Sequence, residues 1–138
     1  MRKIVPCLPC WMLCVVLSLG LLTGSVYASE GVTVVTTETF DSEILEEEGL
    51  VFAFLWAVWN KPSQMMAPIV EELAYKYDGK LKAVKINTDG NPDIAKRYRI
   101  EGLPTFIFFK NGEKLDQTVG SLSMSQLEGK IDSFLEEN

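Results

Sequence analysis

Two uninterrupted apolar runs limit the possible folds of this sequence more than any other feature. They are LVFAFLWA at residues 50–57 and PTFIFFK at residues 104–110. Each run is short, rich in aromatic or β-branched side chains and bounded by turn residues. Such runs are typical of strands that are buried on both faces of a sheet. Because a sheet of this kind needs helices on both sides, the sequence predicts an α/β domain.

The remaining segments supply the helices and further strands of such a domain. Alternating patterns predict strands at residues 31–37, 81–87 and 114–120, and helical patterns cover residues 40–49, 60–77, 91–98 and 123–134. A hairpin turn at Asn111–Glu113 joins the last two strands. This order predicts a central mixed, mainly parallel sheet flanked by helices on both faces.

Capping residues mark the expected helix ends. Asn60 and Asn91 stand at favoured N-cap positions, and Ser123 opens a capping box. Gly49 is suited to a C-cap. Pro68 lies deep in the longest predicted helix, where it removes a hydrogen bond and should bend the axis.

The first thirty residues differ in character from the rest. After Arg2 and Lys3 the next charge is Glu30. A basic start followed by an apolar stretch and a small residue at Ala28 is typical of a secretory signal peptide cut after Ala28. The alternative is an uncleaved membrane anchor, since the uncharged run is long enough to span a bilayer. We therefore expect residues 1–28 to be a signal peptide and residues 29–138 to form one domain. The protein would be secreted or periplasmic, and membrane-anchored only if the leader remains.

The distribution of cysteine and histidine excludes several chemistries from the predicted domain. All three cysteines, Cys7, Cys10 and Cys14, lie in the leader, and the sequence contains no histidine. The CLPC stretch resembles a redox motif, but its position in an apolar leader makes it accidental. Residues 29–138 therefore lack cysteine nucleophiles, Cys/His zinc sites and Ser-His-Asp triads.

The charge balance argues against nucleic acid as a partner. The chain carries 13 basic and 19 acidic residues, a net charge of −6. Without Arg2 and Lys3 the 13 basic residues become 11, so residues 29–138 have a net charge of −8. Such a surface repels nucleic acid and anionic lipids. We also expect a monomer without a cofactor. No metal site is expected, because the acidic run Glu46–Glu48 is typical of a solvated helix end and residues 87–93 do not fit an EF-hand.

Stretches spread along residues 56–120 resemble one family, the thioredoxins. The matching segments are WAVW (56–59), MAP (66–68), YDGK (77–80), KINTD (85–89), NP (91–92), LPT (103–105), FKNGE (109–113) and VG (119–120). They occur in the family's order and extend from residue 56 to residue 120 of the predicted domain. The resemblance implies the thioredoxin fold, in agreement with the predicted element order.

The resemblance also implies where an active site would lie. The family's active site reads WCGPC, in which two cysteines exchange a disulfide with a substrate. The corresponding residues here are WNKPS, so Asn60 and Ser63 occupy the cysteine positions. The family's buried carboxylate, which assists proton transfer, corresponds to Phe54. These three positions are degenerate, and no catalytic residue is predicted.

A peptide-binding groove is the second feature that the resemblance implies. Pro104 corresponds to the family's cis-proline, which faces the active-site tip, so we expect a cis Leu103–Pro104 bond. The candidate binding residues are Trp59, Asn60, Lys61, Pro62, Leu103 and Pro104. An extended peptide or protein is the expected partner, although Pro104 could also serve the fold alone.

These features lead to a functional prediction with an alternative. The predicted function is an exported, redox-inactive thioredoxin-like protein that binds polypeptides as a scaffold or chaperone-like module, and the chain is not expected to be an enzyme. The alternative is a thioredoxin-type protein-disulfide oxidoreductase, with thiols from a partner or from the leader. A glutathione-transferase-like role for Ser63 is a third possibility, but it would need an added helical domain.

Overall fold

The computed structural model describes residues 31–137, so the predicted signal peptide and Cys7, Cys10 and Cys14 lie outside the described residues. The strands are β1 (Thr33–Val34), β2 (Leu50–Trp56), β3 (Leu81–Asn87), β4 (Thr105–Lys110) and β5 (Glu113–Val119). The helices are η1 (Asp41–Leu45, a π-helix), α1 (Lys61–Lys76), α2 (Pro92–Arg97) and α3 (Met124–Glu136). Within residues 31–137, no helix combines the length and the apolar character needed to cross a membrane.

The five strands form one mixed sheet in the order β1-β3-β2-β4-β5. β1, β3 and β2 are parallel, whereas β4 runs antiparallel to both β2 and β5. The two apolar runs are the central pair, β2 and β4, and nearly all of their residues are buried. This arrangement confirms the predicted α/β class with a mixed sheet flanked by helices.

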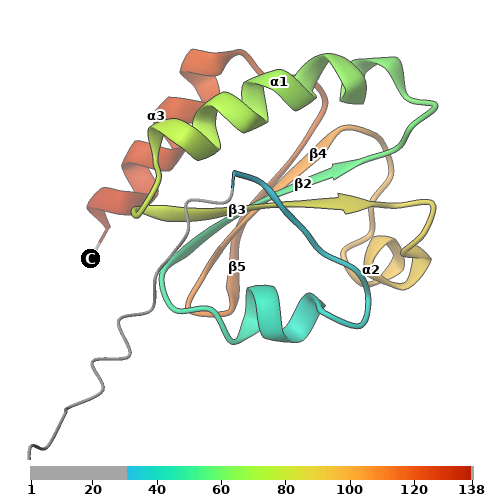
Figure 1. The fold of residues 1–138 in the computed structure, drawn as a ribbon, viewed down its shortest axis with the longest axis horizontal. Helices are drawn as coiled ribbons and strands as arrows, with labels where there is room; N and C mark the ends of the chain where they lie inside the picture. Colours follow the sequence, from blue (N-terminus) through green and yellow to red (C-terminus); the bar gives the residue numbers. More distant parts are fainter. Residues whose placement is uncertain (1–30, 138) are drawn as a thin grey trace, which may run out of the picture.

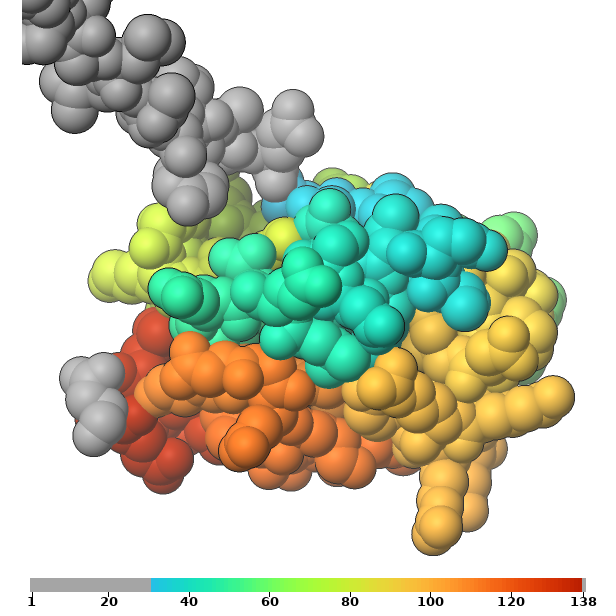
Figure 2. Space-filling view, turned by 90° about the horizontal axis from the view of Figure 1, so that it is seen from below, coloured from blue at the N-terminus to red at the C-terminus, as the bar shows by residue number. Residues whose placement is uncertain are grey.

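Each face of the sheet carries its own core. α1 and α3 lie together on one face, and η1 and α2 cover the other (Figure 1). The α1 side contains Phe52, Phe54 and Phe106, and the η1 side contains Phe40 and Phe109. Alternate residues of β2 and β4 supply both cores, because successive strand side chains point to opposite faces. Figure 2 shows the second face, on which the η1 segment borders both the α2 region and the β4–β5 hairpin.

The segment before β2 differs from the prediction. The expected strand over residues 31–37 is reduced to Thr33–Val34, because the backbone turns at Thr36, whose N–H donates a hydrogen bond to the hydroxyl oxygen of Thr39 at 3.0 Å. The expected helix over residues 40–49 is the five-residue η1. Hydrogen bonds between threonine side chains and local backbone compete with a longer strand at this point.

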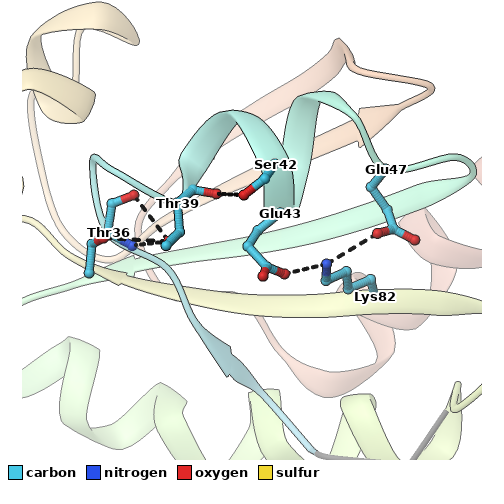
Figure 3. A network of polar contacts seen from close by, with 6 residues as sticks. All are labelled: Thr36, Thr39, Ser42, Glu43, Glu47 and Lys82. Carbon is cyan, nitrogen blue, oxygen red and sulfur yellow. Dashed lines mark hydrogen bonds and ion pairs between the residues drawn. The ribbon is translucent and has the colours of Figure 1, made fainter. Parts of the chain in front are cut away.

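An ion-pair network attaches η1 to the sheet. Lys82 Nζ on β3 lies 2.5 Å from Glu43 Oε2 and 3.1 Å from Glu47 Oε2 (Figure 3). Partial burial alone would lower the pKa of Lys82, but the hydrogen bonds to both carboxylates outweigh it and the pKa is raised. Glu43 of the predicted helix and Glu47 of the predicted solvated run are therefore both paired with Lys82.

The caps agree with the prediction at two of three helices. Asn60 caps α1, and Ser123 forms the capping box of α3. Asn91 stands at the N-cap position of α2 but makes no capping bond, because its side-chain oxygen accepts from the N–H of Thr37 at 2.7 Å. α1 continues through Pro68, whose side chain is exposed, so water can reach the carbonyl that loses its helical donor.

Candidate functional site

Four chain segments meet at one edge of the sheet. β2 and β3 are parallel, so the segments that follow them begin at the same edge. β4 starts at this edge, since Thr105 pairs with Leu55 near the end of β2, and β5 ends there, since Val119 pairs with Thr105. We call this edge the tip; it consists of residues 57–62, 88–89, 102–104 and 119–121. The predicted binding residues all belong to it.

Asn60 and Ser63 are joined by a helix cap. Asn60 has an extended backbone, with φ −88° and ψ 105°, and its Oδ1 accepts from the N–H of Ser63 at 2.8 Å. The two positions that the resemblance equates with cysteines therefore contact each other through a capping bond. An amide and a hydroxyl cannot form or break a disulfide, so this pair supplies helix stability rather than a redox centre.

Trp59 is held at the tip with much of its ring in solvent. It is 69% exposed, and its Nε1 donates to Asp89 Oδ1 at 3.1 Å. The bond connects the start of α1 to the segment that follows β3. Val58 is exposed beside it, and the Gln64 side chain donates to the Val58 carbonyl. A fixed, exposed indole presents apolar surface at a small loss of side-chain entropy on binding.

The loop before β4 lies at the same edge as Trp59 and Asn60. The Leu103–Pro104 peptide bond is cis. The carbonyl of Pro104 accepts from the N–H of Gly120 at 2.8 Å, which attaches the end of β5 to this loop. Pro104 is buried and Leu103 is partly exposed. Val119 adds an exposed apolar side chain that would contact any Cβ placed on Gly102.

Phe54 fills the position that the resemblance assigns to a buried carboxylate. Its ring is 2% exposed and stacks on Phe106 with centroids 5.5 Å apart and planes 19° apart. Phe52 extends the same stack on β2. The site is apolar, so Phe54 contributes packing and offers no proton to a reaction at the tip.

Two buried polar atoms behind the tip have no hydrogen-bond partner among residues 31–137. They are the hydroxyl of Ser63 and Nε1 of Trp56. Ser63 is 0% exposed, so its hydroxyl does not face a ligand at the tip surface. A role in which Ser63 activates a bound thiol has no support in this geometry.

Two of the cavities on the described surface lie at different ends of the domain. The larger, about 670 Å³, lies at the starts of β2 and β3 and is lined by none of the predicted site residues. The smaller, about 350 Å³, adjoins the tip and is lined by Lys61, Pro62, Met65, Met66, Ile69 and Ser121. The smaller cavity is the candidate binding site, because only this one of the two is lined by predicted binding residues.

Some residues at and beside the tip were not predicted. Asp89 accepts a hydrogen bond from Trp59, and Val119 and Ser121 extend the tip beyond the expected groove. Met65 lies beside the tip and lines the smaller cavity. Met65 directly precedes Met66, which lies on the apolar face of the helix. A large apolar residue outside that face is the sequence signal that could have identified Met65 as a surface contact. The other contacts depend on strand pairing, which the sequence does not display. No group of acidic, cysteine or histidine residues within 31–137 is arranged to hold a metal.

Comparison with known proteins gives consistent relatives. The family model described as Thioredoxin matches residues 31–133. Thioredoxin 1 of Nostoc sp. is 42% identical over 101 residues, which are 73% of this chain and 94% of the relative. Thioredoxin of Synechocystis sp. is 38% identical over the same shares. Thioredoxin M-type, chloroplastic, of Pisum sativum is 39% identical over 104 residues, and the matched part spans 60% of that relative.

These relatives contradict the prediction that the chain is not an enzyme. Proteins about 40% identical over most of the chain are named thioredoxins, and thioredoxins are disulfide oxidoreductases. The prediction was wrong because it treated the residues at two positions as decisive for the whole protein. The absence of cysteine from residues 31–138 remains a fact of the sequence that any reaction scheme must include.

The family model, the relatives and the fold agree with one another over the same part of the chain. The chain therefore belongs to the thioredoxin family.

Proposed function

We propose that this protein acts in thiol–disulfide exchange, with its tip binding the polypeptide that undergoes the reaction. Membership of the thioredoxin family carries the proposal. The tip supports it with exposed apolar side chains at Val58, Trp59 and Val119 beside the Leu103–Pro104 loop. Such a surface is suited to an extended segment of polypeptide.

The reaction requires thiols from outside residues 31–138. In the proposed exchange, a dithiol attacks the substrate's disulfide, the substrate leaves as two thiols, and the dithiol becomes a disulfide. Neither Asn60 nor Ser63 can take the part of this dithiol. The sources are a partner protein or the cysteines Cys7, Cys10 and Cys14.

A second function follows if no dithiol is recruited. The tip would then hold polypeptides without exchange, in the manner of a scaffold or chaperone. The observation that favours it is the capped pair Asn60 and Ser63 in place of two thiols. Both functions use the same surface, so a single set of variants can test them.

The proposed location is outside the cytoplasm. A signal peptide over residues 1–28 would export the protein, and an uncleaved leader would tether it to the membrane. Disulfides form and persist in oxidising compartments, so polypeptide substrates for disulfide exchange are present there. Mass spectrometry of the exported protein tests the cleavage, since an N-terminus at Ser29 means that no thiol of the chain remains.

The test of function uses insulin reduction by the protein expressed from its full-length sequence. Dithiothreitol is the reductant, with and without a cyanobacterial thioredoxin as the dithiol partner, and B-chain turbidity is followed. We expect the protein to accelerate the reaction, and Trp59→Ala to reduce that effect. Tyr75→Ala is the matched control, because Tyr75 is 85% exposed on α1 but lies outside the tip.

The outcomes distinguish the thiol sources and the two functions. If the wild type accelerates the reaction without the partner and a variant with Cys7, Cys10 and Cys14 replaced by serine does not, the leader supplies the thiols. If both proteins accelerate the reaction only with the partner, the partner supplies them. No acceleration above dithiothreitol alone, or above the partner with dithiothreitol, overturns the exchange proposal, and binding of carboxymethylated insulin B chain then tests the holding function alone.

A further inference from the structure

The cavity beside the tip is lined mainly by apolar side chains. Met65, Met66 and Ile69 of α1 line it together with Pro62, and Ser121 closes it from the segment after β5. Met65 is 67% exposed, although it belongs to a helix with a well-buried face. Methionine side chains adapt to different apolar partners, and they are frequent at surfaces that bind varied polypeptides. We call this site the methionine cavity.

Charge also distinguishes the methionine cavity. Lys61 is the one charged residue among those that line it, and the first turn of α1 carries no acidic residue. The protein as a whole is acidic, with a net charge of −6. A negative group on a partner is therefore repelled by most of the surface and is attracted at this rim.

The methionine cavity is continuous with the tip. Ser121 follows Gly120, whose N–H donates to the carbonyl of Pro104. On the other side, Pro62 and Lys61 follow Trp59 and Asn60 directly in the chain. A polypeptide on the tip therefore reaches the cavity within a few residues. At about 350 Å³ the cavity is at the small end of ligand sites, which suits one or two side chains rather than a cofactor.

We propose that the methionine cavity selects the polypeptides that the tip binds: it takes a large aliphatic side chain, and Lys61 pairs with an acidic residue next to that side chain. The inference rests on the proposed function, since it names the substrate class of the same surface. The recognised sequence is an aliphatic residue followed by Asp or Glu in an extended segment. The apolar anchor supplies affinity and the acidic neighbour supplies orientation.

The test is a titration observed at methionine methyl groups. The full-length protein is labelled with ¹³C at its methionine methyls, and Met65 and Met66 are assigned with Met65→Leu and Met66→Leu variants. The probe is the capped peptide Gly-Ser-Leu-Asp-Ser-Gly, and its matched partners carry Ala for Leu or Lys for Asp. Met124 on α3 does not line the cavity, so its methyl is the internal reference.

We expect the Leu-Asp peptide to shift the Met65 and Met66 signals and to leave Met124 in place. Replacing Leu by Ala should weaken binding about tenfold, because the anchor loses most of its buried apolar area. Replacing Asp by Lys should weaken it about threefold, the usual range of an exposed ion pair, and Lys61→Glu should reverse this preference. Tyr75→Ala should change neither.

Several results would overturn the inference. If the three peptides bind equally, or if Lys61→Glu leaves the order of affinities unchanged, the cavity does not select, and the insulin experiment tests the tip separately. If peptides shift only signals distant from Met65 and Met66, the site lies elsewhere. If sedimentation shows a dimer that Met65→Asp converts to a monomer, a second copy of the chain covers the cavity.

Discussion

The side-chain oxygen of Asn60 accepts a hydrogen bond from the backbone N–H of Ser63 at 2.8 Å, at the helix start where thioredoxins carry two cysteines. The bond satisfies one of the free N–H groups of the first turn of α1. Asn60→Ala should therefore destabilise the domain by about 1 kcal/mol in urea unfolding, and Asn60→Ser should retain most of that stability. Equal stability of the alanine and serine variants would contradict this role.

The same pair gives a gain-of-function prediction. Asn60→Cys with Ser63→Cys places two thiols at the first turn of α1, in the spacing that the family uses. We expect this double variant to form an intramolecular disulfide and to accelerate insulin reduction well above the unmodified protein. Each single cysteine variant is the control, since one thiol cannot complete the cycle. A double variant that stays reduced under oxidising conditions would show that the two positions are not suitably placed.

Replacing Ser63 by alanine should not destabilise the domain, unlike most substitutions of buried residues. The Ser63 hydroxyl is fully buried, and it neither accepts nor donates a hydrogen bond within residues 31–137. Ser63→Ala removes an unpaired polar group and keeps the capped backbone N–H. We expect stability to stay level or to rise by about 1 kcal/mol in thermal or urea unfolding. A loss of stability would mean that the hydroxyl has a partner such as a buried water.

Phe54 is expected to contribute strongly to packing. Phe54→Ala leaves a void beside Phe106 and should cost about 3–5 kcal/mol, whereas Phe54→Leu should cost less because it refills part of the volume. Val58→Ala is a control at an exposed apolar position nearby, and it should change stability by about 0.5 kcal/mol or less. Urea unfolding of the three variants checks the order.

The sequence predicted the central elements well because their patterns are local. The apolar runs of β2 and β4, the cap at Asn60 and the capping box at Ser123 depend on residues within one or two turns of chain. Prediction failed where distant residues decide. Asn91 stands at a cap position but bonds to Thr37, and η1 is shorter than its acidic sequence suggested.

The candidate site was predicted only as far as the family's motifs extend. WNKPS and Leu103–Pro104 identified the two main segments of the tip. Asp89 accepts a hydrogen bond from Trp59, and Ser121 lines the methionine cavity. Both residues belong to segments that strand pairing brings to this edge. The functional error had a different origin: the residues at two positions of one motif were treated as decisive for the whole protein, whereas the relatives are named thioredoxins.

The hydrogen bond between Tyr77 and Asp132 predicts a loss of stability at alkaline pH. Tyr77 Oη donates to Asp132 Oδ1 at 2.7 Å between α1 and α3. Burial, together with this bond and the nearby negative charge, raises the pKa of Tyr77 to about 12. An unfolded tyrosine ionises near pH 10, so the unfolded state loses this proton first. The stabilisation is complete below about pH 10 and is lost as the pH rises towards about 12.

The urea midpoint should therefore fall between pH 9 and pH 11.5 in the wild type. In Tyr77→Phe it should fall less, because the contribution of this phenol is then absent from the folded state. Parallel slopes in the two proteins would show that Tyr77 does not control this range.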